Sequence, residues 1–445
     1  MRPRVVIAGT GSGVGKTTIV TGLMARLSRE MGVQGYKVGP DFIDPMFHTA
    51  VTGRPSRNLD SFFMGRDTLE NLYGWSSIGA DISVIEGVRG LYEGSTATGD
   101  KGSTAEIAKI LDAPVVLVVD AKSLTKSAAA IVRGFVSLDP DVNIAGVILN
   151  RIRGERHRSK AVEAVESLTD VPVLGTVERV EDSMPERHLG LVTMPERDRR
   201  EVMDHTVSLV EDIDLDMLMG IAEGASERHF DVEDPFPVGD SSVSVGVPRD
   251  VAFSFYYREN IESLERAGAR VVEFSPVAGD ALPDCDAYYL GGGYPEEHLE
   301  EISGNTDFLE GLWAASMDGR TILGECGGMM TLCRSIERDG VGYPMAGVLE
   351  TNAVQTRGRQ GLSYVRATAT AENPIMEGDV VGHEFHYSKL DPLPKGPFAY
   401  DVGRGVGIDG RHDGIVKGRT VGQYMHQHAL SRKDWGIRFV GSVSP

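Results

Sequence analysis

Long apolar runs are missing from this chain of 445 residues, and cysteine is scarce. No stretch approaches the ~20 consecutive apolar residues that a helix needs to cross a bilayer, so no membrane partner is expected. The chain begins with an apolar run, Val5–Ala8, that leads directly into a polar glycine-rich loop, which is not the pattern of a secretory signal peptide. The three cysteines, Cys285, Cys326 and Cys333, give no disulfide framework, and we therefore expect a cytoplasmic protein.

Positive charge is also in deficit, with 45 Lys and Arg residues against 65 Asp and Glu residues, a formal net charge of −20. Such an acidic chain argues against nucleic acid as a partner. A substrate that carries several carboxylates would be repelled as well, so any site for it must be locally basic. The content of 41% hydrophobic and 25% charged residues is typical of a globular protein, and the length allows two or three domains.

The first half of the chain predicts a parallel sheet covered by helices, because continuous apolar runs alternate with helix-like segments. These runs are Val5–Ala8, Gly35–Val38, Ile82–Ile85, Val115–Val119, Ile144–Leu149 and Val171–Leu174. Residues 222–241 are polar, contain two prolines and lack periodicity, so a linker is expected there. We place a first domain at 1–225, the linker at 226–242 and a second domain at 243–445.

The second half predicts another α/β domain. Its strand-like runs are Val243–Val247, Arg270–Phe274, Ala287–Leu290 and Thr321–Leu323, followed by hairpin-like segments at Ser363–Thr370 and Arg419–Tyr424. A homodimer is compatible with the sequence, which does not specify an oligomeric state.

Residues 9–18 read GTGSGVGKTT and lie between the first apolar run and a helical pattern. Backbone amides of such a loop cradle phosphate oxygens at a helix N-terminus, the lysine reaches the terminal phosphates, and the following threonine can ligate Mg²⁺. We therefore predict an ATP site. The residues assigned to the nucleotide are Gly13, Gly15, Lys16, Thr17, Thr18 and, for the adenine edge, Asn150 at the end of a strand. In isolation, Asn150 would equally serve as a strand terminator.

Acidic residues follow two of the predicted strands. Glu86 ends the run Ile82–Ile85, and the carboxyl ends of parallel strands are where open α/β sheets bind ligands, so Glu86 is predicted to hold Mg²⁺ together with Thr17. A solvated charge at the strand end is the alternative. Asp41 and Asp44 lie on a proline-containing loop and suit the positioning of a metal or of a reacting carboxylate beside the phosphate.

Basic residues flank the same loop. Lys37, Arg54 and Arg57 are predicted to supply the local positive charge that a substrate with many carboxylates requires. The alternative is that the two arginines hold the loop and pair with acids nearby.

The pentapeptide Gly-Glu-Cys-Gly-Gly at residues 324–328 follows the apolar run Thr321–Leu323. A cysteine at the apex of a glycine-flanked turn between a strand and a helix is typical of a nucleophile elbow, although many free cysteines are simply buried. We predict that the Cys326 thiolate attacks an amide, with His426 lowering its pKa and backbone amides near Gly292, Gly293 and Gly327 stabilising the oxyanion. A thiol that opens an amide, next to an ATP site in one chain, indicates amidation driven by glutamine.

Several strings together closely resemble the cobyrinic acid a,c-diamide synthase family over nearly the whole chain. They are KVGPDFIDPMFH (37–48), VIEGVRGLYEG (84–94), YYLGGGYPE (288–296), GECGGMM (324–330) and GHEFHYS (382–388). The resemblance implies a domain similar to dethiobiotin synthetase, followed by a class I glutamine amidotransferase domain. It implies that ATP and L-glutamine are used to amidate the a and c carboxylates of a tetrapyrrole. The tetrapyrrole is cobyrinate in cobalamin biosynthesis or, in a near relative, nickel sirohydrochlorin on the route to the nickel coenzyme of methanogens.

The chain also departs from the family pattern. The acid that usually follows two residues after the amidotransferase histidine is replaced by His428, so a Cys326–His426 dyad is predicted rather than a triad. A buried structural role is favoured for His428, and fits His383 and His386 as well. The rival interpretations are a dethiobiotin synthetase-like enzyme or a partition-type P-loop ATPase. The partition ATPases have a signature lysine where this chain has Gly11, and neither interpretation uses the thiol.

Overall fold

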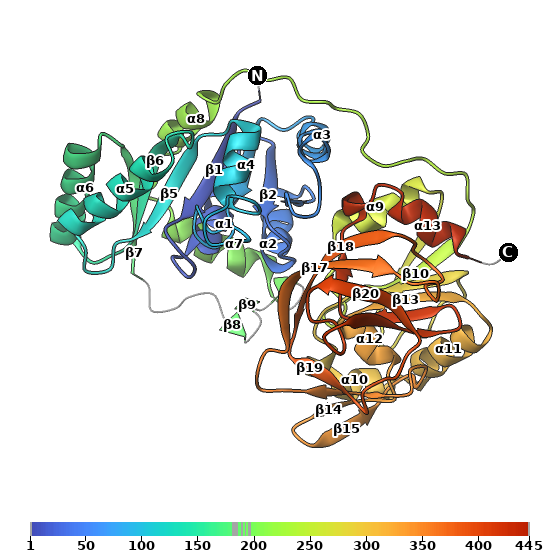
Figure 1. Ribbon diagram of the computed structural model, residues 1–445. Coiled ribbons are helices and arrows are strands. Elements are labelled where there is room, and N and C mark those ends of the chain that lie inside the picture. Colours follow the sequence, from blue (N-terminus) through green and yellow to red (C-terminus); the bar gives the residue numbers. More distant parts are fainter. Residues whose placement is uncertain (1, 180–185, 188–189, 192, 195–196, 444–445) are drawn as a thin grey trace. The chain divides into compact units, whose positions relative to one another are not determined.

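The computed structural model describes residues 2–179, 186–187, 190–191, 193–194 and 197–443 (Figure 1). The chain divides into two compact units, residues 1–234 and 235–445, and the division falls inside the segment 226–242. Within the described residues no helix is long and apolar enough to cross a membrane. Each unit is built around one large sheet.

The first unit contains a seven-stranded sheet with the order β3-β2-β4-β1-β5-β6-β7, and every neighbouring pair is parallel. The strands are β1 Arg4–Gly9, β2 Val33–Val38, β3 Arg57–Leu59, β4 Ile82–Glu86, β5 Val115–Asp120, β6 Ile144–Ile152 and β7 Val173–Glu178, with a separate short pair, β8 Glu186–Arg187 and β9 Gly190–Leu191. The prediction of a parallel sheet is confirmed. Strand β6 extends three residues beyond its apolar run, so Asn150 pairs with Asp120 of β5 inside the sheet.

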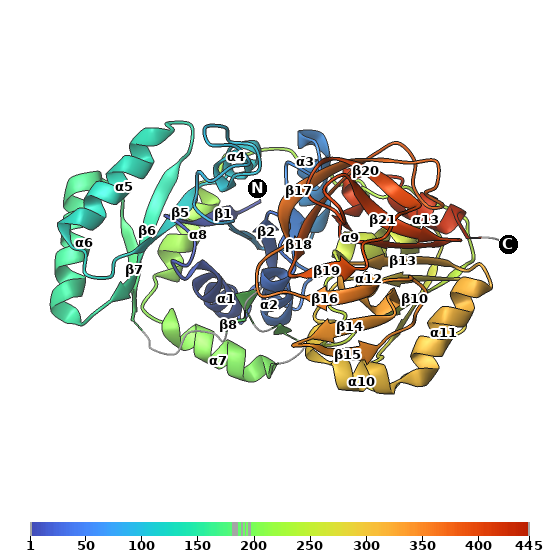
Figure 2. The ribbon, with the colours of Figure 1, turned by 60° about the horizontal axis from the view of Figure 1, so that its bottom comes forward.

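Eight helices of the first unit surround this sheet in the part of the chain that the structure describes. They are α1 Lys16–Leu27, α2 Ile43–Thr52, α3 Arg66–Ser76, α4 Thr104–Leu111, α5 Lys126–Leu138, α6 Glu155–Thr169, α7 Arg199–Leu209 and α8 Leu215–Glu223. Helix α1 lies beside α2 and α7, as Figure 2 shows, and α5 lies beside α6. Apolar side chains of α1, α7 and α8 form one core with those of β1, β4, β5 and β6. This core fixes the start of α1 directly beyond the end of β1.

The second unit contains a ten-stranded sheet with the order β11-β10-β12-β13-β22-β21-β20-β17-β18-β23, and a four-stranded sheet with the order β15-β14-β16-β19. The larger sheet is parallel from β11 to β22 and antiparallel beyond it. Its strands are β10 Ser244–Pro248, β11 Arg270–Phe274, β12 Ala287–Leu290, β13 Thr321–Glu325, β17 Gly361–Ala369, β18 Asp379–His386, β20 Phe398–Arg404, β21 His412–Lys417, β22 Thr420–Gln423 and β23 His426–Gln427. The predicted α/β character of this half is confirmed.

The remaining elements of the second unit cover this sheet or form the smaller one. The helices are α9 Arg258–Arg266, α10 Leu299–Gly304, α11 Thr306–Met317, α12 Gly327–Leu332 and α13 Trp435–Gly441, and the smaller sheet has β14 Ser335–Arg338, β15 Val341–Pro344, β16 Asn352–Gln355 and β19 Ser388–Asp391. Helix α12 packs on β13 and β22, and α9 lies beside α13. The start of α12 therefore lies at the end of β13.

Candidate active sites

The glycine-rich loop connects β1 to α1 at the carboxyl edge of the first sheet. Gly13 and Gly15 have φ angles of 72° and 89°, in the left-handed region that only glycine adopts without strain. The Asn150 amide donates a hydrogen bond to Val14 O at 2.7 Å, and its Oδ1 accepts one from Arg151 N at 2.7 Å. The structure thus shows Asn150 holding the loop, and contact with adenine stays a prediction.

Lys16 is buried against the loop that it follows. Its ammonium donates to Gly11 O at 3.2 Å and to Arg89 O. Burial, reinforced by the nearby Lys37 ammonium, lowers the pKa of Lys16 to about 8. A phosphate in this position would replace two neutral carbonyl acceptors with charged oxygens, so the lysine is placed to gain from an anion.

Three oxygen-bearing side chains meet at the start of α1. The Thr17 hydroxyl lies 2.7 Å from Glu86 Oε1 and 3.2 Å from Asp44 Oδ2. Lys37 Nζ lies 2.5 Å from Asp44 Oδ2 and 3.0 Å from Glu86 Oε1. His48 Nε2 contacts the other oxygen of Glu86 at 2.7 Å. The carboxylates predicted from separate segments are therefore brought together, with Lys37 between them.

Electrostatics distinguish the two carboxylates. Burial alone would raise the pKa of Glu86, but Lys37 and His48 lower it, so Glu86 is ionised. Burial, with Asp41 and Glu86 as neighbouring acids, raises the pKa of Asp44 well above its ordinary value. Burial would lower the pKa of Lys37, but the two carboxylates raise it instead. A second cation would relieve the repulsion among these acids.

This cluster fits Mg²⁺ in chemistry and in donor type. The described residues contain no group of three or more His, Cys, Asp or Glu side chains arranged as a metal site. Mg²⁺ is usually held by one or two protein oxygens together with water and substrate phosphates, so such a group is not required. Thr17 and Glu86 supply those oxygens 2.7 Å apart, at the edge where the phosphate loop ends.

Asp41 and the predicted basic residues engage groups of the protein. The Asp41 carboxylate accepts hydrogen bonds from Ile43 N at 2.7 Å and from Asp44 N at 3.4 Å, which holds the start of α2. Arg54 donates to Gln34 Oε1 and to backbone carbonyls that follow α3. Arg57 is buried with its guanidinium over the Trp75 ring.

The basic residues therefore do not form the exposed patch that the sequence suggested, because two of the three side chains are buried and Arg54 is held by carbonyls. Arg54 holds the loop as the alternative expects, through an amide and carbonyls, and the pairing of the arginines with nearby acids stays a prediction. Lys37 nevertheless lies 3.0 Å from the predicted metal ligand Glu86. Its assignment, and that of the arginines, to the substrate stays a prediction.

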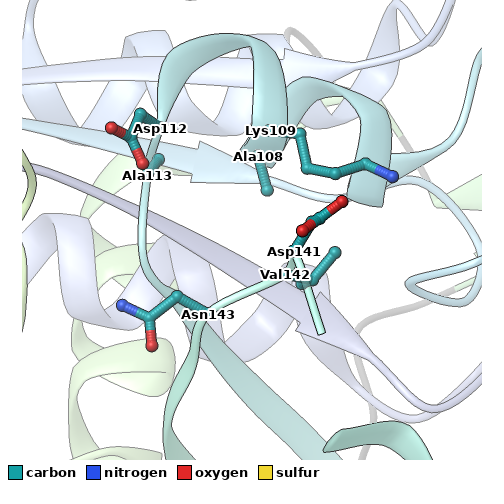
Figure 3. A pocket seen from close by; sticks show the side chains of 7 residues that line it. All are labelled: Ala108, Lys109, Asp112, Ala113, Asp141, Val142 and Asn143. Carbon is teal, nitrogen blue, oxygen red and sulfur yellow. The ribbon is translucent and has the colours of Figure 1, made fainter. Parts of the chain in front are cut away.

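A separate pocket of about 250 Å³ lies at the opposite edge of the first sheet (Figure 3). It is lined by Ala108, Lys109, Asp112, Ala113, Asp141, Val142 and Asn143. These residues lie on α4 and before the starts of β5 and β6, whereas open parallel sheets bind ligands at the carboxyl ends of their strands. Lys109 is also engaged by Asp100 and Asp139, so we assign no ligand to this pocket.

In the second unit, Cys326 forms the turn between β13 and α12. Its φ and ψ angles are 48° and −102°, a conformation that residues with a side chain rarely adopt. Gly328 allows the turn, because a Cβ there would collide with Leu290 O. The Cys326 amide donates to Gln423 O at 2.7 Å. These features are those of the predicted nucleophile elbow.

His426 lies on β23, which pairs with β18 so that His426 is opposite His383. The buried Asp413 accepts hydrogen bonds from Tyr424 N at 3.0 Å and Met425 N at 2.9 Å, and so holds the segment before His426. A Cβ placed on Gly292 would lie 2.5 Å from His426 Cε1. Similarly, a Cβ on Gly327 would lie 3.2 Å from the Gly293 amide nitrogen. His426, the predicted oxyanion amides and the turn at Cys326 therefore lie close to one another.

The thiol itself is in its protonated form. Burial, followed by the neighbouring Glu296 carboxylate, raises the pKa of Cys326 above its ordinary value. The prediction of a lowered pKa is therefore wrong for the protein without substrate, because the thiol is fully enclosed and faces carboxylates. Formation of the thiolate requires a base that takes the proton as the amide is attacked.

The other histidines of this region are buried. Burial, with His426 and His428 as neighbouring rings, lowers the pKa of His383 well below its ordinary value. Burial lowers the pKa of His386 to about 4, and its ring stacks on Tyr424 with centroids 3.6 Å apart. His428 Nδ1 accepts a hydrogen bond from Leu430 N at 3.1 Å. These contacts agree with structural roles.

Sequence comparison places known families over both units. Residues 5–192 match the CobQ/CobB/MinD/ParA nucleotide binding domain, and residues 244–434 match the CobB/CobQ-like glutamine amidotransferase domain. The cobyrinate a,c-diamide synthase of Methanosphaera stadtmanae is 44% identical over 99% of this chain and 99% of that protein. The enzymes of the same name from Methanothermobacter thermautotrophicus and Methanocaldococcus jannaschii are each 47% identical, over 98% and 96% of both chains respectively.

Proposed function

The chain belongs to the family of cobyrinate a,c-diamide synthases, and from this premise we propose that it amidates the a and c carboxylates of cobyrinate with ATP and glutamine. The observation that carries the proposal is the presence of two sites in one chain. The first unit has the phosphate loop with Lys16, and the second has the elbow with Cys326 beside the segment of His426. A dethiobiotin synthetase-like or partition-type ATPase would leave the second site without a use.

In the first unit, the γ-phosphoryl group of ATP is transferred to a substrate carboxylate to give an acyl phosphate. Transfer turns a poor leaving oxygen into phosphate, which ammonia then displaces through a tetrahedral intermediate. Lys16 and Lys37 offset the negative charge around the transferred group. Thr17 and Glu86 would hold Mg²⁺, which would supply further positive charge beside the phosphates. Asp44 and Asp41 stand next to this point and position the reacting carboxylate.

A cavity of about 410 Å³ beside the phosphate loop suits one edge of the tetrapyrrole. It reaches from Thr10 and Gly90 to the apolar side chains of Leu91, Ile131 and Phe135. The apolar wall would contact the macrocycle while a peripheral carboxylate points to the loop. The cavity adjoins the loop itself. A substrate bound in it would place a carboxylate closer to the phosphate than a substrate bound at Arg54 or Arg57.

In the second unit, His426 takes the proton of the Cys326 thiol as the sulfur attacks the side-chain amide carbon of glutamine. The oxyanion is stabilised by backbone amides of the Gly292–Gly293 and Gly327 segments. His426 then gives the proton to the leaving nitrogen, so that ammonia departs and a thioester remains. Water hydrolyses the thioester to glutamate and regenerates the thiol.

Mass spectrometry of the products tests this function directly. The protein is incubated with ATP, glutamine and either cobyrinate or nickel sirohydrochlorin, in which the metal is part of the substrate. Two successive losses of about one mass unit, each for the exchange of OH for NH₂, are expected with cobyrinate. A diamide formed from nickel sirohydrochlorin alone would move the proposal to that substrate. The absence of both amides and of glutamine hydrolysis would favour the ATPase alternatives.

Nucleotide binding should be accompanied by proton uptake above pH 8. The pKa of Lys16 is lowered to about 8 before binding, and phosphate oxygens favour its charged form, so the pKa rises on binding. At pH 8.5 about 0.7 proton should be taken up per nucleotide, and close to none at pH 6.5. Calorimetric titration in buffers of different ionisation enthalpy measures this number. Lys16→Arg stays charged throughout and should abolish the uptake, and equal uptake in both proteins would contradict the assignment.

A further inference from the structure

Two fully buried carboxylate–histidine pairs occur among the described residues of the second unit. Glu325 Oε2 lies 3.4 Å from His426 Nδ1, and Glu259 Oε2 lies 3.5 Å from His428 Nε2. Resting on the proposed function, we propose that Glu325 orients His426 for the hydrolysis of glutamine. Glu325 thereby takes the place of the acid that this chain lacks at His428.

The Glu325 carboxylate is held rigidly by its neighbours. Tyr289 OH donates to Oε2 at 3.0 Å, and Gln427 N donates to Oε1 at 3.1 Å. The same tyrosine oxygen accepts a hydrogen bond from Asn260 at 3.0 Å. Because Glu325 directly precedes the nucleophile and Gln427 directly follows His426, this one carboxylate links the two strand ends that carry the reacting groups.

The position of the carboxylate determines which ring nitrogen acts as the base. To accept the thiol proton at Nε2, the neutral imidazole must carry its own proton on Nδ1 and direct it to an acceptor. Glu325 lies at Nδ1, whereas the Gly292 segment lies at the Cε1 and Nε2 edge of the ring. After His426 has taken the thiol proton, the adjacent negative charge stabilises the imidazolium.

The two neighbouring histidines on β18 add no charge at this contact. His383 on β18 stacks on the ring with centroids 5.1 Å apart, and its lowered pKa makes it neutral. His386, whose pKa is about 4, is neutral as well. Glu259 lies at His428 instead. Replacing Glu325 should therefore remove the group that accepts the proton of His426 Nδ1.

The test is the substitution Glu325→Gln, with Glu259→Gln as the matched control at the second pair. Glutamine keeps the volume and can still accept from Gln427 N, but its amide nitrogen would stand where Oε2 accepts, which favours the wrong tautomer of His426. We expect kcat for glutamine hydrolysis to fall about 10²- to 10⁴-fold with KM nearly unchanged. Alkylation of Cys326 by iodoacetamide should slow, and amidation from ammonium salts should be unaffected.

Wild-type kcat and alkylation in folded Glu325→Gln, or equal losses in Glu259→Gln, would overturn the inference. If Glu325→Gln does not fold, Glu325→Asp keeps an acceptor with a shorter reach, and should lose kcat by a smaller factor at unchanged KM. Wild-type kcat in that variant would equally overturn it. Glutamine hydrolysis that survives Cys326→Ala would instead contradict the proposed function itself.

Discussion

Replacing Cys326 by alanine is expected to abolish amidation that uses glutamine and to leave amidation from added ammonium salts intact. On the proposed function the glutamine amide is opened by the Cys326 sulfur, and loss of a nucleophile of this kind costs on the order of 10⁶ in kcat. On the same proposal free ammonia would attack the acyl phosphate in the first unit and would not need the thiol. The rate of diamide formation, measured with each nitrogen source, separates the two sites.

Cys333 provides a matched control, because it is another buried cysteine at the end of α12. Its sulfur contacts Met329 O within the helix. Cys333→Ala should keep both activities apart from a modest loss of stability. If amidation from glutamine and amidation from ammonium salts fell equally in a folded Cys326→Ala protein, glutamine and ammonia would not use separate sites.

Lys16→Ala should remove amidation from both nitrogen sources, since the carboxylate must be activated before any nitrogen enters. The Lys16 ammonium is the charged side-chain group that points to the glycine-rich loop. Removal of one hydrogen-bond donor to a transferred group typically lowers kcat by about 10²- to 10³-fold. The expected loss is at least of this size, because binding of ATP is weakened as well. Initial rates at saturating ATP and at low ATP distinguish the two contributions.

Lys109→Ala is the control for this variant, because Lys109 is a lysine of the same unit that is paired with acids at the opposite edge of the sheet. It should retain normal activity. Amide formation from ammonia at the wild-type rate in Lys16→Ala would mean that the carboxylate is activated elsewhere than at the glycine-rich loop.

Local patterns were sufficient to predict six of the seven strands of the first sheet, the glycine-rich loop and the turn at Cys326, whereas β3 and most strands beyond residue 330 were not predicted. The parallel strands of the first half appear as unbroken apolar runs because both faces of that sheet are covered, and the glycines around Cys326 show a turn that few other residues could form. Both signals are contained in a few consecutive residues. The observed strand ends nevertheless differ from the predicted ones where polar residues continue a strand, as Asn150 does in β6.

The burial of charged side chains could not be read in the same way. The sequence predicts that Arg57 and Lys37 supply positive charge to a substrate, but the Arg57 guanidinium is buried over Trp75, and Lys37 is enclosed by Asp44 and Glu86. A sequence gives the sign of each side-chain charge, but not whether the side chain is buried or which groups it contacts. Long-range pairing decides this, since Lys37 and Glu86 meet only because β2 and β4 are neighbours in the sheet.

The carboxylate at His426 was missed for a related reason. The family resemblance predicts an acid two residues after the histidine, where this chain has His428, whereas Glu325 precedes His426 by about a hundred residues. Its signal was present, however, as a glutamate directly before Cys326, at the end of a strand whose other residues are Thr, Ile, Leu and Gly. A buried acid at such a position needs a partner, and His426 is near enough to be one.

The strained backbone conformation of Cys326 lowers the stability of the fold, while its thiol is the group that the proposed activity requires. A side chain at φ 48° and ψ −102° costs on the order of 1–3 kcal/mol, and glycine would remove that cost. Selection for stability alone would therefore favour glycine at this position, and on the proposed function the cysteine persists because its thiol opens the glutamine amide. A lineage supplied with free ammonia would be released from this constraint, so a glycine at this position in a descendant would record the loss of the glutaminase.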